Sequence, residues 1–347
     1  MRILILGGTA FLSSEIARQA VASGHQVTCL ARGTTREPPG GATWVRADST
    51  EGAPAYAGLG GDWDAVVDVS RDPEQARQAL EALSARTAHW TFVSSCSVYA
   101  DHSTPGADED AKLLPPLPEG TPATPESYGE SKSAIEQLTL TVAGAMAFIV
   151  RPGLIAGPDD ASDRYGYWPA RFAGSQDPAL LPDIPDQPTQ VIDVRDLAAW
   201  VLTAAEGGLT GAFNAVGDVV PFGEYIDESR RQAGVLGETV VADAGWLAEH
   251  GVQYWSGPDS LPLWLPPGYE GFSTRSNAAA RTHGLALRPW QETLGDTLDD
   301  ERARGLGRGR KAGLTAGREQ LLVEQLRAAS ELTEPAVKAG GNPKRSP

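Results

Sequence analysis

The sequence predicts an α/β protein: a Rossmann-like, doubly wound parallel sheet with a smaller, interleaved C-terminal lobe. Apolar, strand-like runs alternate with helix-like segments through the first half of the chain, which favours a parallel sheet covered on both faces. A glycine turn joins the first such run to the first helix-like segment. After residue 151 this rhythm gives way to a stretch rich in Gly, Pro, Asp and aromatic residues, which indicates a second lobe.

Hydrophobic spacing predicts each element in turn. Residues 2–6 are an apolar run typical of a buried strand, and residues 11–22 carry apolar side chains at helical spacing before Gly24. Residues 191–205 indicate a strand followed by a helix, with Asp196 as its N-cap or first-turn acid. Further strands are expected at 26–30, 43–45, 64–69, 89–94, 147–150 and 211–217, and helices at about 73–83, 128–142 and 316–332.

Composition excludes several classes of protein. The 347 residues include 29 basic and 45 acidic side chains, so the net charge of −16 disfavours a general nucleic-acid binder. No window approaches 18 apolar residues and the first residues do not form a signal peptide, so we expect a cytoplasmic protein without a membrane span. Cys29 and Cys96 lie in strand-like runs and are expected to be buried free thiols. The scattered histidines predict no metal site.

The stretch ILILGGTAFLSSEIA has the layout of a dinucleotide-binding turn, in which glycines let the backbone approach a pyrophosphate at a helix N-terminus. Ala10 and Ser13 stand where the second and third glycines of the usual motif would fall, so the motif is weakened but not destroyed. A chance match is the alternative, because short glycine motifs are common. The candidate cofactor-binding residues of this turn are Gly7, Gly8, Thr9, Ala10, Phe11 and Leu12.

The end of the second predicted strand bears on the choice of cofactor. An acid there commonly holds the ribose hydroxyls of NAD, but Ala31 takes its place and Arg32 follows. An arginine suits a 2′-phosphate, so NADP is expected, with NAD as the alternative. Arg36 is a second candidate, and a solvated surface role for Arg32 is the other interpretation.

The stretch SYGESKSAIEQL places Tyr128 and Lys132 four residues apart, on one face of a predicted helix. An ammonium beside a phenol stabilises the phenolate, so Tyr128 is a candidate acid/base near neutral pH. The spacing alone is weak, since it is common on exposed helices. Its position is more specific, because the helix follows a strand that ends VSSCSVYA, and ligands bind at the carboxyl ends of parallel strands.

Together these stretches resemble an extended short-chain dehydrogenase/reductase of the NAD-dependent epimerase/dehydratase superfamily. The matching stretches cover roughly residues 1–217 in the family's order: GGTAFLS, VRADS, DAVVDVS, VSSCSVYA, YGESK, RPGLIAGP, VIDVRDLA and FNAVG. The resemblance implies that Tyr128 is the acid/base, that Lys132 is its partner and holds the nicotinamide ribose, and that Ser95 binds the reacting oxygen, with Ser94 and Ser97 as alternatives. It also implies that the cofactor is lined by Asp48, Val69, Ser70, Ser94, Pro152, Leu154 and Ile155.

The family builds its substrate pocket after the sixth strand, where this chain has DRYGYWPARF. Substrate contacts are therefore expected from Ser97, Tyr165, Tyr167, Trp168 and Arg171; packing of the second lobe is the alternative for the aromatic residues. The chain departs from the family's nucleotide-sugar enzymes because RPGLIAGP lacks their asparagine, which weakens a sugar-nucleotide substrate. Arg71, after the fourth strand, stands where typical members carry small residues.

The resemblance implies a domain organisation and a function. Residues 1–155, completed by about 188–217, are expected to bind NAD(P), and residues 156–187 and 218–300 to form the substrate-binding lobe. Residues 301–347 form an extension, expected to be disordered after about 335. We expect an oxidoreductase acting on a small molecule, as a monomer or homodimer. The alternatives are an epimerase or dehydratase that retains NAD, and a non-catalytic dinucleotide sensor.

Overall fold

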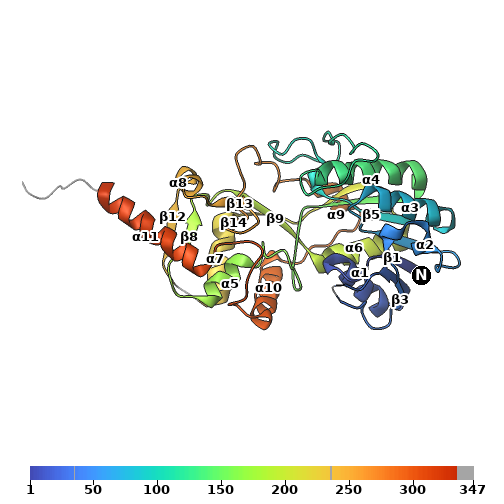
Figure 1. Ribbon diagram of the computed structural model, residues 1–347, viewed down its shortest axis with the longest axis horizontal. Coiled ribbons are helices and arrows are strands. Elements are labelled where there is room, and N and C mark those ends of the chain that lie inside the picture. Colours follow the sequence, from blue (N-terminus) through green and yellow to red (C-terminus); the bar gives the residue numbers. More distant parts are fainter. Residues whose placement is uncertain (35, 235–236, 334–347) are drawn as a thin grey trace, which may run out of the picture.

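The computed structural model describes residues 1–34, 36–234 and 237–333. The expectation of disorder after about residue 335 falls outside these residues. The chain folds into a sheet domain and a second lobe that lie side by side along the long axis of the molecule (Figure 1).

The sheet domain is built on seven parallel strands in the order β10-β6-β5-β4-β1-β2-β3, which confirms the predicted doubly wound fold. The order reverses beside β1, and this reversal makes a ligand-binding crevice at the carboxyl ends of the strands. The strands are β1 (Arg2–Leu6), β2 (Gln26–Ala31), β3 (Thr43–Arg46), β4 (Ala65–Asp68), β5 (Trp90–Val93), β6 (Ala147–Pro152) and β10 (Gly211–Ala215).

Helices cover both faces of this sheet, as the continuous apolar runs of its strands require. In β1, Ile3 and Ile5 pack in a core with α1 and α6, whereas Leu4 and Leu6 pack with α2, α3 and α4 on the opposite face. The helices of this domain are α1 (Phe11–Ala22), α2 (Ala53–Tyr56), α3 (Pro73–Leu83), α4 (Tyr128–Ala143), α6 (Val194–Gly207) and α9 (Ala278–Thr282). Four 3₁₀ turns accompany them: η1 (Ser49–Glu51), η2 (Ser84–Arg86), η3 (Cys96–Val98) and η4 (Gly144–Met146).

The second lobe has its own core, which is rich in aromatic side chains. Its strands form three small sheets in the orders β11-β9-β7, β12-β8 and β13-β14. They are β7 (Leu154–Ala156), β8 (Ala179–Pro182), β9 (Pro188–Asp193), β11 (Val219–Pro221), β12 (Thr239–Ala242), β13 (Gln253–Trp255) and β14 (Ser260–Pro262). Its helices are α5 (Tyr167–Gly174), α7 (Phe222–Ala233), α8 (Ala244–Glu249), α10 (Trp290–Arg304) and α11 (Ala316–Thr333), the last of which lies at the end of the molecule far from the sheet (Figure 1).

The structure decides between the two roles that the sequence left open for Asp196, and it also places a basic stretch near the end of the chain. The N-cap of α6 is Asp193, whose carboxylate accepts a hydrogen bond from the Arg195 N–H, so Asp196 is the first-turn acid. The basic stretch 302–311 begins inside α10 and is tied to the second lobe, because Arg304 and Arg308 pair with Asp163.

Three further properties bear on function. Cys29 and Cys96 are buried free thiols, as predicted, and burial raises the pKa of each to about 12. In the described part of the chain, no helix is long and apolar enough to cross a membrane. Over the same residues, no group of His, Cys, Asp and Glu side chains is arranged to hold a metal ion.

Candidate active site

The glycine turn between β1 and α1 keeps the geometry that a dinucleotide needs. Gly7 and Gly8 have φ angles of +122° and +82°, in the left-handed region that favours glycine. A Cβ on Gly8 would lie 2.5 Å from the Cys29 Sγ, so the turn has no room for a side chain there. No side chain caps the N-terminus of α1, which leaves its first N–H groups available to an anion. The turn therefore fits a pyrophosphate despite the exposed Ala10 and the buried Ser13.

The remaining cofactor candidates of this turn have different surroundings. Thr9 and Phe11 are half-buried, whereas Leu12 packs in the core between the sheet and α1. The side chain of Val69 lies against Gly7, since a Cβ on that glycine would be 3.2 Å from it. Pro152 ends β6, and Leu154 and Ile155 follow in β7.

Arg32 and Asp48, the candidates for the adenosine end, lie beside one another. Their side chains are 3.7 Å apart, and that of Arg32 is 59% exposed. Hydrogen bonds from Thr50, with a smaller contribution from Arg32, hold the pKa of Asp48 below its usual value. Arg36 instead pairs with Asp159 at 2.9 Å. Of the two arginines, Arg32 is therefore the one whose side chain is mostly exposed and lies beside Asp48 after the end of β2.

Tyr128 and Lys132 occupy the first turns of α4, as the spacing predicts. The Lys132 Nζ lies 5.9 Å from the centre of the Tyr128 ring and donates to the carbonyls of Ser70 (2.6 Å) and Val93 (2.7 Å). Lys132 is 3% exposed. Tyr128 is half-buried, and its hydroxyl has no hydrogen-bond partner among the residues described, so the hydroxyl is available to a ligand.

The environment of Lys132 includes an acid that sequence analysis missed. Burial lowers the pKa of Lys132 to about 7; Asp68 and Glu136 oppose this shift, and Arg71 adds to it. Asp68 is fully buried at the end of β4, where its carboxylate accepts from the Ser70 N–H (2.8 Å) and Oγ (2.5 Å). Burial raises the pKa of Asp68. The signal in the sequence was an acid at the end of the apolar run AVVD.

The three serine candidates separate into two environments. Ser95 is the N-cap of η3: its Oγ accepts from the Ser97 N–H and lies 3.1 Å from the Ser97 Oγ. Both are half-buried. Ser94 is buried and donates to Glu136 at 2.5 Å, so its hydroxyl belongs to an internal network with Arg151. Ser95 and Ser97 are thus the serines left to contact a substrate.

Gly129 explains how the tyrosine comes close to this serine turn. A Cβ at Gly129 would lie 2.4 Å from the Ser97 carbonyl oxygen and 2.6 Å from the Leu114 side chain. The N-terminus of α4 therefore packs directly on η3. This contact sets the position of Tyr128 relative to Ser95 and Ser97.

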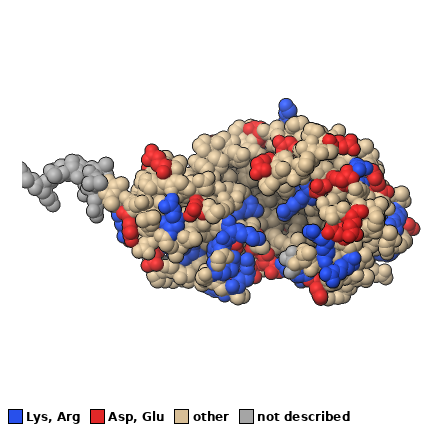
Figure 2. Space-filling view, viewed as in Figure 1, with Lys and Arg blue, Asp and Glu red and all other residues tan. Residues whose placement is uncertain are grey.

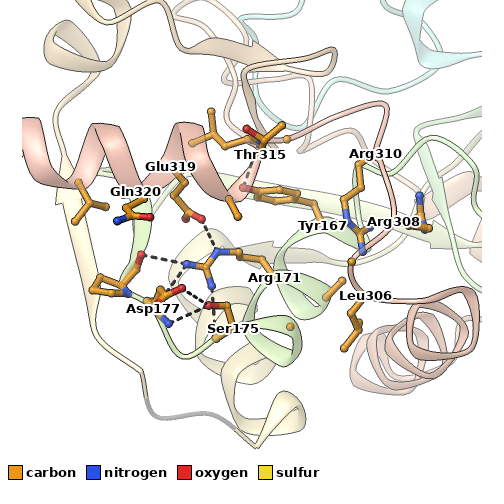
Figure 3. Close-up of a pocket in the computed structure, with 18 of the residues that line it drawn as sticks. Tyr167, Arg171, Ser175, Asp177, Leu306, Arg308, Arg310, Thr315, Glu319 and Gln320 are labelled. Atoms are coloured by element: carbon orange, nitrogen blue, oxygen red, sulfur yellow. Dashed lines mark hydrogen bonds and ion pairs between the residues drawn. The ribbon is translucent and has the colours of Figure 1, made fainter.

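The candidate substrate residues of the second lobe lie away from the carboxyl edge of the sheet. Tyr165, Tyr167 and Trp168 are 2% exposed or less and belong to the core of the lobe, which is the packing role that sequence analysis held as the alternative. Arg171 pairs with Glu319 at 2.5 Å. Arg171 and Tyr167 line a cavity of about 560 Å³ between α5, α11 and the segment 306–316 (Figure 3). Tyr128, Lys132 and Ser95 do not line it.

Two further arginines, Arg164 and Arg71, interact electrostatically with groups of the sheet-edge site. Arg164 lies between β7 and α5, within the stretch DRYGYWPARF, and its charge interacts with Tyr128 and with Arg71. Figure 2 shows basic side chains gathered around the hollow between the two parts of the molecule. This local positive charge contrasts with the net charge of −16.

Comparisons with known proteins bear on the family and the fold of this chain. Residues 70–215 match the sequence model of the NAD dependent epimerase/dehydratase family, a region that contains Tyr128 and Lys132 but begins after the glycine turn and Arg32. The chloroplast stem-loop binding protein of 41 kDa b from Arabidopsis thaliana is 28% identical over 218 residues, which are 58% of this chain and 54% of that protein. The chain thus spans about half the length of this curated relative.

Solved structures share the fold across both parts of the chain. A putative epimerase from Burkholderia cenocepacia J2315 superposes with a TM-score of 0.69 at 22% identity, over 87% of this chain and 98% of the other. UDP-glucuronic acid 4-epimerase from Bacillus cereus, solved in complex with NAD, gives 0.62 at 15% identity, over 87% and 99%.

Fold and site together define a Rossmann-like α/β protein with a candidate dinucleotide site at the carboxyl edge of its sheet. The match of residues 70–215 to the NAD dependent epimerase/dehydratase family agrees with the resemblance found in the sequence.

Proposed function

We propose that the protein is an NAD(P)-dependent enzyme that transfers a hydride between nicotinamide and a carbinol or carbonyl carbon of a small molecule, with Tyr128 as the acid/base. The observation that carries this proposal is the grouping of a free tyrosine hydroxyl, a buried lysine and a serine turn at the carboxyl edge of the sheet. The bound cofactor supplies the hydride acceptor or donor.

The residues of this chain have distinct tasks in that reaction. The glycine turn and the N-terminus of α1 bind the anionic part of the cofactor. The Ser95 or Ser97 hydroxyl holds the substrate oxygen, and Tyr128 takes or returns its proton. The Lys132 ammonium, held by the carbonyls of Ser70 and Val93, stabilises the phenolate that forms on Tyr128.

The test is Tyr128→Phe in the full-length protein. Loss of a general acid/base typically lowers the rate about 10²–10⁴-fold, and the cofactor dissociation constant should change little because the hydroxyl alone is removed. Steady-state rates and cofactor titration measure the two effects. Tyr269→Phe, at an exposed tyrosine outside the site, is the matched control. Near-normal turnover by Tyr128→Phe would remove Tyr128 from the mechanism.

A second candidate is an epimerase or dehydratase that uses the same hydride chemistry transiently and retains its cofactor. The names of the family and of the similar structures favour it. Denaturing the purified protein and analysing the released nucleotide distinguishes the two. Stoichiometric NAD points to internal recycling, whereas an empty site that fills with NADPH and consumes it against carbonyl compounds supports net redox chemistry.

The stem-loop binding named in one relative gives a third, testable alternative. We propose a small-molecule substrate rather than nucleic acid, because the chain carries 45 acidic against 29 basic residues. A labelled RNA hairpin titrated at physiological salt should show no saturable binding. Micromolar or tighter binding would overturn this choice.

A further inference from the structure

Arg275 attaches the connecting loop, residues 100–127, which runs from the serine turn η3 to Tyr128. Arg275 comes shortly before α9 and is 2% exposed; its Nη2 donates to the Asp101 carbonyl at 2.6 Å and to the His102 Nδ1 at 3.2 Å. In the part of the chain that the structure describes, its Nε and Nη1 have no hydrogen-bond partner. The position of this buried guanidinium therefore depends on the two loop residues that it contacts.

The same guanidinium covers the residue that ends the serine turn. Its Cζ lies 3.9 Å from the centre of the Tyr99 ring, a cation–π contact, and Tyr99 is the C-cap of η3. Tyr99 is fully buried, and its hydroxyl donates to the Asn214 side chain at 2.6 Å and accepts from Arg151 at 3.1 Å. Arg275 thus contacts both the serine turn and the connecting loop that begins after it.

The first part of the connecting loop packs directly on the segment before α9. The Gly271 N–H donates to the His102 carbonyl at 2.7 Å. A Cβ on Gly271 would lie 2.2 Å from the Thr104 carbonyl oxygen, so the two segments touch through their backbones. Because the loop begins after Ser97 and ends at Tyr128, its attachment helps to fix where these two candidate site residues lie.

The contact between Arg275 and His102 requires a neutral imidazole. A guanidinium has donors and no acceptor, so the His102 Nδ1 accepts this hydrogen bond and the ring carries its proton on Nε2. In the protonated ring both nitrogens are donors, and two cations would face one another across the same contact. The ring is held in this orientation between Tyr269, stacked at 5.1 Å, and Phe272, edge to face at 5.3 Å.

The charged and titratable groups around His102 favour its neutral form. Burial and Arg275 lower the pKa of His102, and Asp101 opposes this shift. The Asp101 carboxylate accepts hydrogen bonds from the two residues that follow His102. On the facing segment, Tyr269 stacks on the ring, and the exposed Glu270 carboxylate accepts from a backbone N–H of its own turn.

We propose that Arg275 and His102 form a latch that positions the serine turn by holding the connecting loop against the segment before α9, and that protonation of His102 opens this latch. The consequence for catalysis rests on the proposed function, whereas the latch itself does not.

The direction of the pH effect follows from the hydrogen bond. In the open loop His102 is solvated and has its ordinary pKa of 6.5, and in the closed loop its pKa is lower. Below pH 6.5 the open form therefore binds more protons than the closed form, and its population rises by up to about tenfold per pH unit. The connecting loop is held at neutral and alkaline pH and is released in mild acid.

Hydrogen exchange of the full-length protein without cofactor, measured by mass spectrometry, tests the latch. After correction for the intrinsic rate of each amide, peptides that cover residues 101–107 and 270–276 should exchange at least about threefold faster at pH 5.5 than at pH 8.0. Peptides from β1 and β5 should keep their protection, because the sheet stays folded.

Variants at two histidines separate the latch from general sensitivity to acid. His102→Gln keeps an acceptor for Arg275 but does not titrate, so these peptides should exchange at the same corrected rate at both pH values. His102→Lys places a permanent cation beside Arg275 and should exchange fast at both. His250→Gln, at a histidine that stacks on Trp246 in the second lobe, is the matched control and should behave as the wild type.

Three outcomes would overturn the proposal. They are wild-type exchange in these peptides that does not change with pH, the same pH dependence in His102→Gln as in the wild type, and loss of protection in β1 and β5 at pH 5.5, which would assign the change to global unfolding. None of these measurements involves turnover, so failure here is distinct from failure of the Tyr128→Phe test.

Discussion

Lys132 shows what residue spacing can and cannot establish. The interval between Tyr128 and Lys132 predicts that they share a helix face, and the structure brings them together. The same interval on an exposed helix has no chemical consequence. The difference lies in the carbonyls of Ser70 and Val93, which come from other parts of the chain and bury the ammonium. Spacing along one helix contains no information about such distant neighbours.

The aromatic residues of the second lobe show that a sequence pattern can also indicate site residues that the structure buries in a core. A stretch with Tyr165, Tyr167 and Trp168 after the sixth strand resembles a substrate pocket, yet all three side chains lie in the core. Arg164, in the same stretch, is only half-buried, and its charge interacts with Tyr128. Sequence alone does not reveal which residues of an irregular segment face inward.

The burial of Lys132 predicts a specific pH dependence of stability. Its pKa is about 7 in the folded state and 10.5 ordinarily, so between these values the unfolded chain binds more protons. The contribution of Lys132 to stability is therefore fully present above pH 10.5 and is lost as the pH falls through 7. The unfolding free energy of the wild type, relative to Lys132→Met, should rise from pH 7 to 9.5 by at most about 1.4 kcal/mol per pH unit.

Denaturant titration of both proteins without cofactor measures this difference. Lys112→Met removes an exposed lysine and should leave the slope of the wild type unchanged. If the difference in unfolding free energy between the wild type and Lys132→Met stays constant across this pH range, Lys132 is not desolvated.

Arg32 predicts cofactor preference. We expect tighter binding of NADP(H) than of NAD(H), because an exposed guanidinium at the end of β2 can pair with a 2′-phosphate. Arg32→Ala should lose roughly 1.5–3 kcal/mol of binding free energy for NADP(H), which is about ten- to a hundredfold in affinity. Its affinity for NAD(H) should change little. Calorimetry with both cofactors measures this. Equal affinities in the wild type would refute it, and Arg36→Ala, at the arginine paired with Asp159, is the control.

At the scale of elements, the predicted bounds are correct where the apolar stripe of one helix packs against one face of the sheet. Helices α1 and α3 begin and end at the residues that hydrophobic spacing indicates. Strands β7, β13 and β14 have three residues each, too few to show alternation, and their pairing is set by the packing of the whole lobe. The elements of the sheet domain can thus be predicted from the sequence, whereas most elements of the second lobe cannot.

The contact between α4 and η3 gives an element-scale prediction. Gly129→Ala places a Cβ against the Ser97 carbonyl, so α4 must shift and Tyr128 with it. Because misplacement of reacting groups by about 1 Å can cost about 10²-fold, turnover should fall by at least tenfold while cofactor affinity changes less. Gly207→Ala is the matched control: it is also helical, and no atom lies within 4 Å of its added Cβ. A Gly129→Ala enzyme as active as this control would contradict the positioning role.

At the scale of the whole molecule, charged groups join the sheet domain to the second lobe. Asp193 ends β9, caps α6 and accepts hydrogen bonds from the Arg195 side chain and from Thr293 of α10. Arg195 also pairs with Asp296 of α10 at 2.5 Å. Helix α10 in turn contacts α5 and α7 of the second lobe. Tyr128 of the sheet domain and Arg164 of the second lobe come from parts that this junction holds together.

Asp193→Asn should therefore weaken the junction. The Asp193 side chain is 1% exposed; burial opposes its ionisation, but hydrogen bonds from Arg195 and Thr293 hold its pKa below the usual value. Its contribution to stability is thus present above the ordinary pKa of 3.8 and is lost as the pH falls through the lower folded value. At pH 7 the variant removes the buried charge that accepts from Arg195 and Thr293, and because Arg195 keeps its pair with Asp296 the loss is about 1–3 kcal/mol of unfolding free energy. Asp218→Asn, which breaks an exposed pair with Arg281, should cost no more than about 1 kcal/mol. Denaturant unfolding at pH 7 and pH 3 measures both effects, and equal losses in the two variants would show that Asp193 does not hold the lobes together.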